Sequence, residues 1–96
     1  MVLHTLTVET TSNATASRAQ AVKVLEEAAE VFASRDMMQK AYEQGVDAKV
    51  ALHIERKLAD EIADLIISAT GLAQRWNIDL ASALARKSKV NKERGY

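Results

Sequence analysis

Residues 50–76 read VALHIERKLADEIADLIISATGLAQRW and form the most regular hydrophobic pattern in the chain. Aliphatic residues recur there every three or four positions, as at Ile54, Leu58 and Ile62, and the pattern runs on to Trp76. This spacing is that of one face of an α-helix, and a helix of this length would measure roughly 40 Å. The stretch therefore predicts one long amphipathic helix with a wide apolar stripe.

A second, polar row lies beside that stripe on the same predicted helix. It comprises His53, Lys57, Glu61, Asp64 and Ser68. Glu61 stands at the border between the two rows, which predicts a half-buried carboxylate. Because burying an unpaired charge is costly, such a carboxylate must be paired, protonated or bound to a metal ion.

Another acidic pair lies on a helix predicted over residues 15–34. The apolar stripe of this helix spans about 120° on a helical wheel and consists of Val22, Leu25, Ala28, Ala29 and Phe32. Glu27 and Glu30 lie on the opposite side, with Val24 and Val31 as a smaller apolar patch beyond them. An acidic face with such apolar neighbours differs from an ordinary solvated face.

The N-terminal segment differs in composition from the rest. Residues 1–14 are rich in Thr and Val, which favours a short extended arm. We expect the helical domain to occupy residues 15–96, with Thr15 or Ser17 as the cap of its first helix. No internal repeat stands out along the chain.

A polar connector is predicted between the two acidic helices. Residues 35–49 contain few apolar positions and include Gly45. A short helix over residues 37–44, stopped by Gly45, fits this composition because glycine commonly follows the last turn of a helix.

The last predicted helix changes from apolar to basic along one face. Asn77 is expected to end the preceding helix, and Asp79 to cap a helix over residues 80–93. Its later turns carry Lys87, Asn91 and Arg94, which continue a stripe begun by leucines. These residues form either a plain polar helix end or a set that grips phosphate oxygens.

Composition narrows the classes of protein to consider. The chain has 96 residues, 48% of them hydrophobic, with no Pro and no Cys, which favours a single all-α domain and excludes thiolate chemistry. The formal net charge is zero, so no general attraction to nucleic acid or membrane is expected. With no long apolar run, a cytoplasmic location is expected. A domain this small buries only about 60–65% of its unfolded surface, so we expect a homodimer or homotetramer to complete the helical bundle.

The two acidic pairs together predict a site for a divalent cation. Four carboxylates on two packed helices match the oxygen ligands of Mg²⁺, with Mn²⁺ as the alternative, and Mg²⁺ in turn indicates a phosphorylated substrate. A di-iron site is disfavoured because neither His4 nor His53 stands in a Glu-x-x-His relation to these acids. Lys57 either pairs with Glu61 one turn away or contacts phosphate.

The order of the motifs resembles the MazG-like, all-α nucleoside triphosphate pyrophosphohydrolases. The first motif, E-E-x-x-E, contains Glu26, Glu27 and Glu30. The second, E-x-x-D, contains Glu61 and Asp64, and the third, K-x-x-x-N-x-x-R, contains Lys87, Asn91 and Arg94. The segment WNIDLASAL, before the last helix, is also similar to the family's turn into that helix. The resemblance covers residues 20–96 and implies a helical bundle often completed by a second subunit.

The chemistry that this resemblance implies is hydrolysis of a (deoxy)nucleoside triphosphate to the monophosphate and pyrophosphate. Glu27, Glu30, Glu61 and Asp64 would hold Mg²⁺, and Lys87, Asn91 and Arg94 would contact phosphate or neighbouring nucleotide groups. Either Glu27 or Glu30 would act as the catalytic base that orients the attacking water.

Two alternatives remain at the level of sequence. A phosphoribosyl-ATP pyrophosphohydrolase shares both acidic motifs, but it usually carries a His soon after the second motif, where this chain has Ile67 and Ser68. A non-catalytic helical interaction module would instead keep its acids solvated or paired with Lys and Arg.

Overall fold

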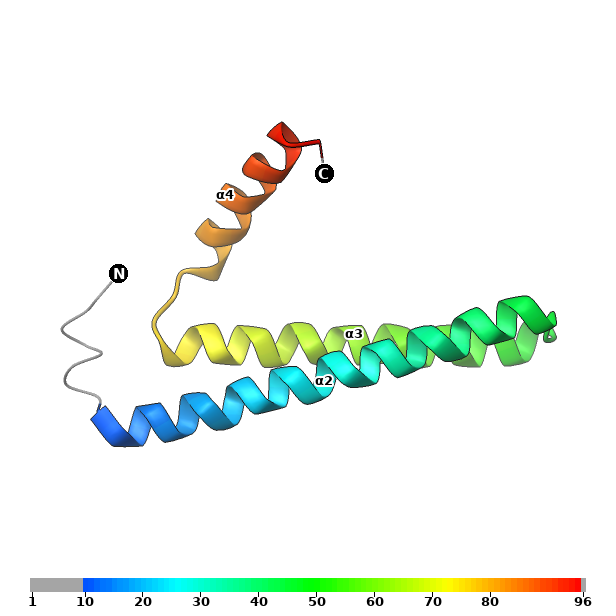
Figure 1. Cartoon of the computed structure of the whole chain (residues 1–96), viewed down its shortest axis with the longest axis horizontal. Helices are drawn as coiled ribbons and strands as arrows, with labels where there is room; N and C mark the ends of the chain where they lie inside the picture. The colour runs from blue at the N-terminus through cyan, green and yellow to red at the C-terminus, as the bar shows by residue number, and fades with distance from the viewer. Residues whose placement is uncertain (1–9, 96) are drawn as a thin grey trace.

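Three α-helices make up the part of the chain that the computed structural model describes, residues 10–95. They are α2 (Thr10–Gln44), α3 (Ala48–Arg75) and α4 (Leu80–Glu93). The first two pack against each other as a long antiparallel hairpin, and α4 leads away from one end of it (Figure 1). No strand occurs within residues 10–95, so the predicted all-α class is confirmed.

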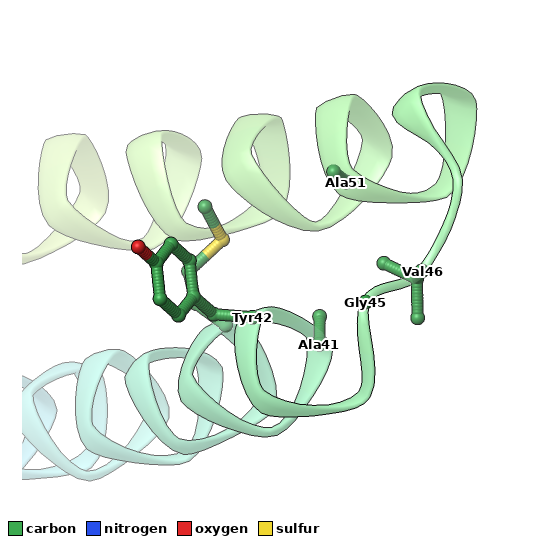
Figure 2. A pocket seen from close by; sticks show the side chains of 6 residues that line it. Ala41, Tyr42, Gly45, Val46 and Ala51 are labelled. Atoms are coloured by element: carbon green, nitrogen blue, oxygen red, sulfur yellow. The ribbon is translucent and has the colours of Figure 1, made fainter.

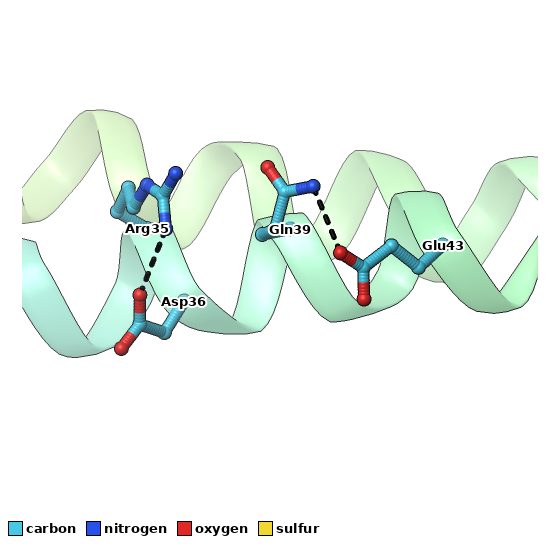
Figure 3. Close-up of polar contacts among 4 residues, drawn as sticks. All are labelled: Arg35, Asp36, Gln39 and Glu43. Carbon is cyan, nitrogen blue, oxygen red and sulfur yellow. Dashed lines mark hydrogen bonds and ion pairs between the residues drawn. The ribbon is translucent and has the colours of Figure 1, made fainter.

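The predicted interruption between the helix over residues 15–34 and the short helix over residues 37–44 is wrong, because α2 is one continuous helix of 35 residues that ends at Gln44. Residues 35–44 are mostly polar, but they include neither Gly nor Pro, and polar residues by themselves do not interrupt a helix. Side-chain contacts support its exposed second half: Gln39 Nε2 donates to Glu43 Oε1 at 3.1 Å, one turn apart, beside the Arg35–Asp36 ion pair (Figure 3). The separate connector and short helix therefore merge into α2.

The start of α2 also differs from the prediction. Residues 10–14 belong to the helix, so the predicted arm is wrong over this part, and its first nine residues lie outside the described range. Thr15 and Ser17 are not caps but stand inside the helix. The hydroxyl of Ser17 donates to the Ala14 carbonyl at 3.1 Å, a local bond within the helix.

The ends of the helices follow the chemistry of their capping residues. Gly45 ends α2 with a φ of 67°, and its N–H donates to the Ala41 carbonyl at 3.0 Å, as predicted. Asn77, also in the left-handed region with a φ of 53°, follows α3 as predicted. Asp79 caps α4 by accepting from the Ser82 N–H at 3.0 Å, whereas the equivalent cap of α3, Asp47, was not predicted.

The helix-packing seam of the hairpin alternates spacings of three and four residues. Buried or half-buried residues with this spacing on α2 are Ser17, Gln20, Val24, Glu27, Val31, Ser34, Met38 and Ala41, and on α3 they are Ala51, Ile54, Leu58, Glu61, Leu65, Ser68 and Leu72. This is the heptad spacing of two helices packed in the manner of a coiled coil. Between the N-terminal part of α2 and the C-terminal part of α3, Gln20 Nε2 donates a hydrogen bond to the Ser68 carbonyl at 2.9 Å.

The apolar stripe predicted for the first helix is not the side that packs on α3. Leu25 and Phe32 are 72% and 66% exposed, while Val24 and Val31, the smaller predicted patch, lie in the seam. Within residues 13–95 the buried hydrophobic residues are only Ala41 and Ala73. The hairpin therefore leaves most of its large aliphatic side chains uncovered.

The tip of the hairpin carries a small apolar hollow. Its walls are Met38, Ala41, Tyr42, Gly45, Val46 and Ala51, contributed by the end of α2, the turn and the start of α3 (Figure 2). In the described part of the chain, no helix has a stretch long and apolar enough to cross a membrane.

Candidate metal centre

Two glutamates occupy positions in the middle of the seam, where coiled-coil packing normally places apolar residues. Glu27 comes from α2 and Glu61 from α3, and their side chains are only 9% and 14% exposed. Helix geometry puts a residue three positions later on the same side, so Glu30 and Asp64 stand at the edge of the seam beside them. The sequence folds this way because the aliphatic seam residues on either side hold both helices in register.

The predicted acidic residues converge at this point. One carboxylate oxygen from each of Glu27, Glu61 and Asp64 lies within 4.8 Å of the others. Glu30 lies beside this cluster: the Glu61 carboxyl, with which a protonated Glu30 would share a hydrogen bond, and the negative charges of Glu27 and Glu61 raise the pKa of Glu30 above the ordinary glutamate value. The structure thus brings three of the four predicted carboxylates within reach of one ion, and Glu30 lines a hollow together with Glu61.

Each seam glutamate is only half satisfied. Lys23 Nζ lies 3.2 Å from Glu27 Oε1, and Lys57 Nζ lies 3.3 Å from Glu61 Oε1, each pair one helical turn apart. The hydrogen bond and the charge of Glu27 raise the pKa of Lys23. The second oxygen, Oε2, of each glutamate is buried and has no hydrogen-bond partner in the described part of the chain.

These unpartnered oxygens test whether the cluster suits a metal ion. Leaving a buried acceptor unsatisfied costs about 1–3 kcal/mol, and more when the group is charged. A hard divalent cation bound by oxygen ligands removes that cost and the mutual repulsion of the four acids at once. The donor set, all carboxylate oxygen, fits Mg²⁺ or Mn²⁺ and does not fit a soft metal.

Basic side chains lie next to the acids on the same side of the hairpin. One open hollow is lined by His53, Arg56, Lys57, Asp60 and Glu61, and a neighbouring one by Glu30, Ala33, Ser34, Met37, Lys57 and Glu61. Lys57 lines both hollows. It pairs with Glu61 one turn away, which was one of the two roles predicted for it. Sequence reasoning missed Arg56; its position directly before Lys57 was the available signal.

The three predicted phosphate-binding residues of the last helix are not brought to the acids. Lys87 and Asn91 lie on α4, which diverges from the hairpin (Figure 1), and Arg94 directly follows its last residue. The junction before α4 is ordered by local bonds, such as that from the Ile78 N–H to the Ala73 carbonyl at 2.9 Å. Such bonds fix the turn without docking the helix.

The acidic segment of α2 is repeated in α3, which corrects the statement that no internal repeat exists. Residues 23–30 read KVLEEAAE and residues 57–64 read KLADEIAD, an offset of 34 positions, with charges of the same sign at every matching place. The two copies meet in the antiparallel hairpin, so an approximate two-fold axis relates Glu27 to Glu61 and Glu30 to Asp64. Aligning the sequence with itself would have revealed the relation.

In comparisons with known proteins, the chain matched no family model, no curated protein and no solved structure. The resemblance to MazG-like enzymes therefore stays a prediction that depends on the three motifs.

Proposed function

We propose that this protein hydrolyses a (deoxy)nucleoside triphosphate to the monophosphate and pyrophosphate in a reaction that depends on Mg²⁺. The observation that carries the proposal is the pair of buried carboxylate oxygens without a hydrogen-bond partner on Glu27 and Glu61, inside a cluster that these two residues form with Asp64. In a surface network that only stabilises the fold, both carboxylate oxygens would be solvated or hydrogen-bonded. We infer the substrate class from the order of the three sequence motifs, which resembles that of the nucleoside triphosphate pyrophosphohydrolases.

The proposed cation site consists of Glu27, Glu30, Glu61 and Asp64. Held by these four carboxylates, Mg²⁺ would supply positive charge that offsets the negative charge developing as the phosphoanhydride breaks. Mn²⁺ has similar ligand preferences and is expected to substitute for it.

The protein's own side chains would position water and phosphate. Glu27 or Glu30 would accept a hydrogen bond from the attacking water and take its proton. Lys57 and Arg56 line the hollow beside the acids, where their positive charges favour phosphate oxygens. The seam itself, closed by aliphatic side chains, limits the access of bulk water to the buried side of the cluster.

Lys87, Asn91 and Arg94 fit this scheme if α4 turns back alongside α3. Glu61 lies 14 residues before the end of α3 at Arg75, and Asn91 lies 11 residues into α4, which correspond to about 21 Å and about 16 Å of helix. The last turns of α4 would then stand within about one helical turn of the acids. In this arrangement the three side chains would contact the phosphates.

A second candidate function is a non-catalytic helical interaction module. The exposed apolar side chains of the hairpin, such as Leu25 and Phe32, favour it. In that case the acidic cluster would bind no nucleotide, and the protein would release pyrophosphate from none.

The test is a pyrophosphate-release screen over common and modified (d)NTPs, with phosphoribosyl-ATP included for the related pyrophosphohydrolase activity. We expect equal amounts of monophosphate and pyrophosphate from at least one substrate with Mg²⁺ or Mn²⁺, and none with EDTA. Glu61→Gln should abolish the reaction, while Glu55→Gln, an exposed carboxylate on the same helix, should not. No pyrophosphate from any substrate, with no effect of Mg²⁺ on the unfolding temperature, would reject the hydrolase.

A further inference from the structure

Both seam glutamates have a lysine partner on the preceding turn of their own helix. Lys23 Nζ lies 3.2 Å from Glu27 Oε1 on α2, and Lys57 Nζ lies 3.3 Å from Glu61 Oε1 on α3. The two lysines occupy corresponding positions of the internal repeat, 34 residues apart. The same arrangement on both helices indicates a common role for the two lysines.

Stabilisation of the individual helices does not explain these pairs well. An ion pair one turn apart stabilises a helix more when the glutamate precedes the lysine than in the reverse order. Here the lysine precedes the glutamate in both copies of the repeat. The order of the residues therefore favours a role at the seam carboxylates over a role in the helices.

The two partners of each pair differ in how firmly they are held. The glutamate side chains are 9% and 14% exposed, whereas the lysine side chains are 58% and 50% exposed. Glu27 and Glu61 are fixed by the packing of α2 on α3, but a solvated lysine can swing into water on its flexible stem. The lysine is therefore the member of each pair that can leave without disturbing the seam.

The lysines neutralise only part of the charge at this point. When all four carboxylates are ionised, the two lysines leave two negative charges, which is the charge that one divalent cation neutralises. The Oε2 atoms of Glu27 and Glu61 also stay buried without a hydrogen-bond partner in the part of the chain that the structure describes. Each glutamate thus has one oxygen held by a lysine and one oxygen left for another ligand.

A lysine and a divalent cation compete for the same carboxylate. An ammonium group at one oxygen repels a cation that approaches the other, because charges in a largely buried site are weakly screened. In the metal-free protein, the same ammonium group reduces the repulsion among the acids. A lysine at this position therefore stabilises the metal-free hairpin and lowers its affinity for the cation.

We propose that Lys23 and Lys57 are displaceable counter-ions of the cation site. They hold the seam carboxylates together in the metal-free protein, and they leave Glu27 and Glu61 when these residues bind a divalent cation. The two lysines thereby set the affinity of the site for the cation. This inference deepens the proposed function, on whose cation site it rests.

Lys57 and its counterpart on α2 have different neighbours. His53 and Arg56 line a hollow together with Lys57, whereas Ala19 and Val22 occupy the corresponding places 34 positions earlier. Once displaced from its glutamate, Lys57 can donate to phosphate oxygens in this hollow. Its two predicted roles, an ion pair on its own helix and a phosphate contact, then belong to the metal-free and the metal-bound states.

The test is the affinity of the full chain for Mn²⁺ without nucleotide, measured by calorimetry or by the EPR signal of free Mn²⁺. Lys23→Met and Lys57→Met should each lower the dissociation constant about tenfold, because a charge-assisted hydrogen bond no longer has to be broken. Lys57→Gln, which keeps a neutral hydrogen-bond donor, should also lower it and covers the case in which Lys57→Met does not fold.

Arg56→Met is the matched control. It removes the same charge from the hollow beside Glu61, but Arg56 belongs to none of the ion pairs in the described part of the chain. It should change the dissociation constant far less than Lys57→Met does. An equal effect of the two variants would overturn the proposal, because the general charge of the surface would then account for the change.

The unfolding temperature gives a second readout. In EDTA, Lys57→Met should unfold at a lower temperature than the wild type, since the acids lose a counter-ion. With saturating Mn²⁺ the difference should disappear, because Lys57 no longer pairs with Glu61 in the wild type either. An ion pair with a purely structural role would lower the temperature equally in both conditions, and that result would also overturn the proposal.

Failure of this inference and failure of the proposed function give different results. If the wild type binds Mn²⁺ and a lysine variant binds it no more tightly, that lysine is not a displaceable counter-ion, while the cation site stands. If the wild type binds no Mn²⁺, the cation site and this inference are both rejected. With saturating Mn²⁺, Lys57→Met should raise the KM for the nucleotide and Lys23→Met should not; equal KM values would exclude the phosphate contact of Lys57.

Discussion

Glu27 is the only charged residue that is buried among residues 13–95. One of its oxygens is paired with an exposed lysine, and the other has no partner in the described part of the chain. A sequence selected for stability alone would place an aliphatic residue at this seam position, as it does at Val24 and Val31. The cost in stability is explained if the site exists to bind a cation.

The first prediction concerns this cost. Glu27→Gln should raise the free energy of unfolding of the metal-free protein by about 0.5–2 kcal/mol, because it removes one charge from the repelling cluster. It should also remove the stabilisation by Mg²⁺, which for the wild type is about 2.7 kcal/mol at a hundredfold excess over the dissociation constant. Chemical denaturation with EDTA or with Mg²⁺ measures both quantities.

Glu26→Gln is the matched control, since Glu26 is the exposed neighbour of Glu27 on α2. It should leave the Mg²⁺ response at the wild-type level. If Glu27→Gln retains the full response, Glu27 is not a ligand.

The second prediction concerns pH. The hydrogen bond with Glu61 and the adjacent negative charges raise the pKa of Glu30 in the folded state above 4.5. The folded state therefore holds its proton more tightly than the unfolded state, so this group favours folding at low pH and loses that contribution as pH rises through its folded pKa. In EDTA, the unfolding temperature should rise as pH is lowered from 7 toward the folded pKa of Glu30.

Glu30→Gln should reduce this rise, because glutamine does not titrate. An unchanged pH profile in the variant would show that the dependence arises from other groups.

At the scale of the helices, the sequence predicted boundaries better than faces. The bounds of α4, its Asp79 cap and the stop at Gly45 followed from local chemistry, and they are confirmed. The continuity of α2 did not follow, because polar residues such as Gln39 and Glu43 resemble a connector yet are good helix formers.

The misassigned face has a different cause. A helical wheel shows which residues share a side, but it does not show which of two apolar sides a neighbouring helix covers. The seam of α2 includes Ser17, Gln20, Glu27 and Ser34, so its apolar character is weaker than that of the side with Leu25 and Phe32. The convergence of the acids was nevertheless predictable, because their spacing of three residues and the packing of two long helices left few other arrangements.

The third prediction concerns α4. Lys87→Ala and Arg94→Ala should each raise the KM for the nucleotide about tenfold or more, because a charge-assisted hydrogen bond is worth about 1.5–3 kcal/mol. The Mg²⁺ response of the unfolding temperature should stay unchanged, since these residues lie outside the acidic cluster. Steady-state kinetics and thermal unfolding separate the two effects.

Lys89→Ala removes an exposed charge from the opposite side of α4 and should leave KM unchanged. If both Lys87→Ala and Arg94→Ala keep the wild-type KM, these residues do not bind the substrate phosphates, and Lys57 and Arg56 would take that role instead.

At the scale of the whole molecule, the two faces of the hairpin divide its properties. Exposed apolar side chains such as Leu25 and Phe32 lie on one side of the hairpin, and the carboxylates of the proposed cation site lie in the seam and on the other side. Substitutions of the acids should therefore alter cation binding, and substitutions at Leu25 or Phe32 should not. α4 is attached through residues 76–79 and leads away from both sides of the hairpin (Figure 1).

The most direct test of the account is a crystal structure of the protein grown with Mn²⁺, in which anomalous scattering locates the ion. The account predicts an anomalous peak within coordination distance of carboxylate oxygens of Glu27, Glu61 and Asp64, with Lys23 or Lys57 displaced from its glutamate. A crystal without a peak at this position, in which the four acids keep only their lysine partners or turn to water, would contradict it.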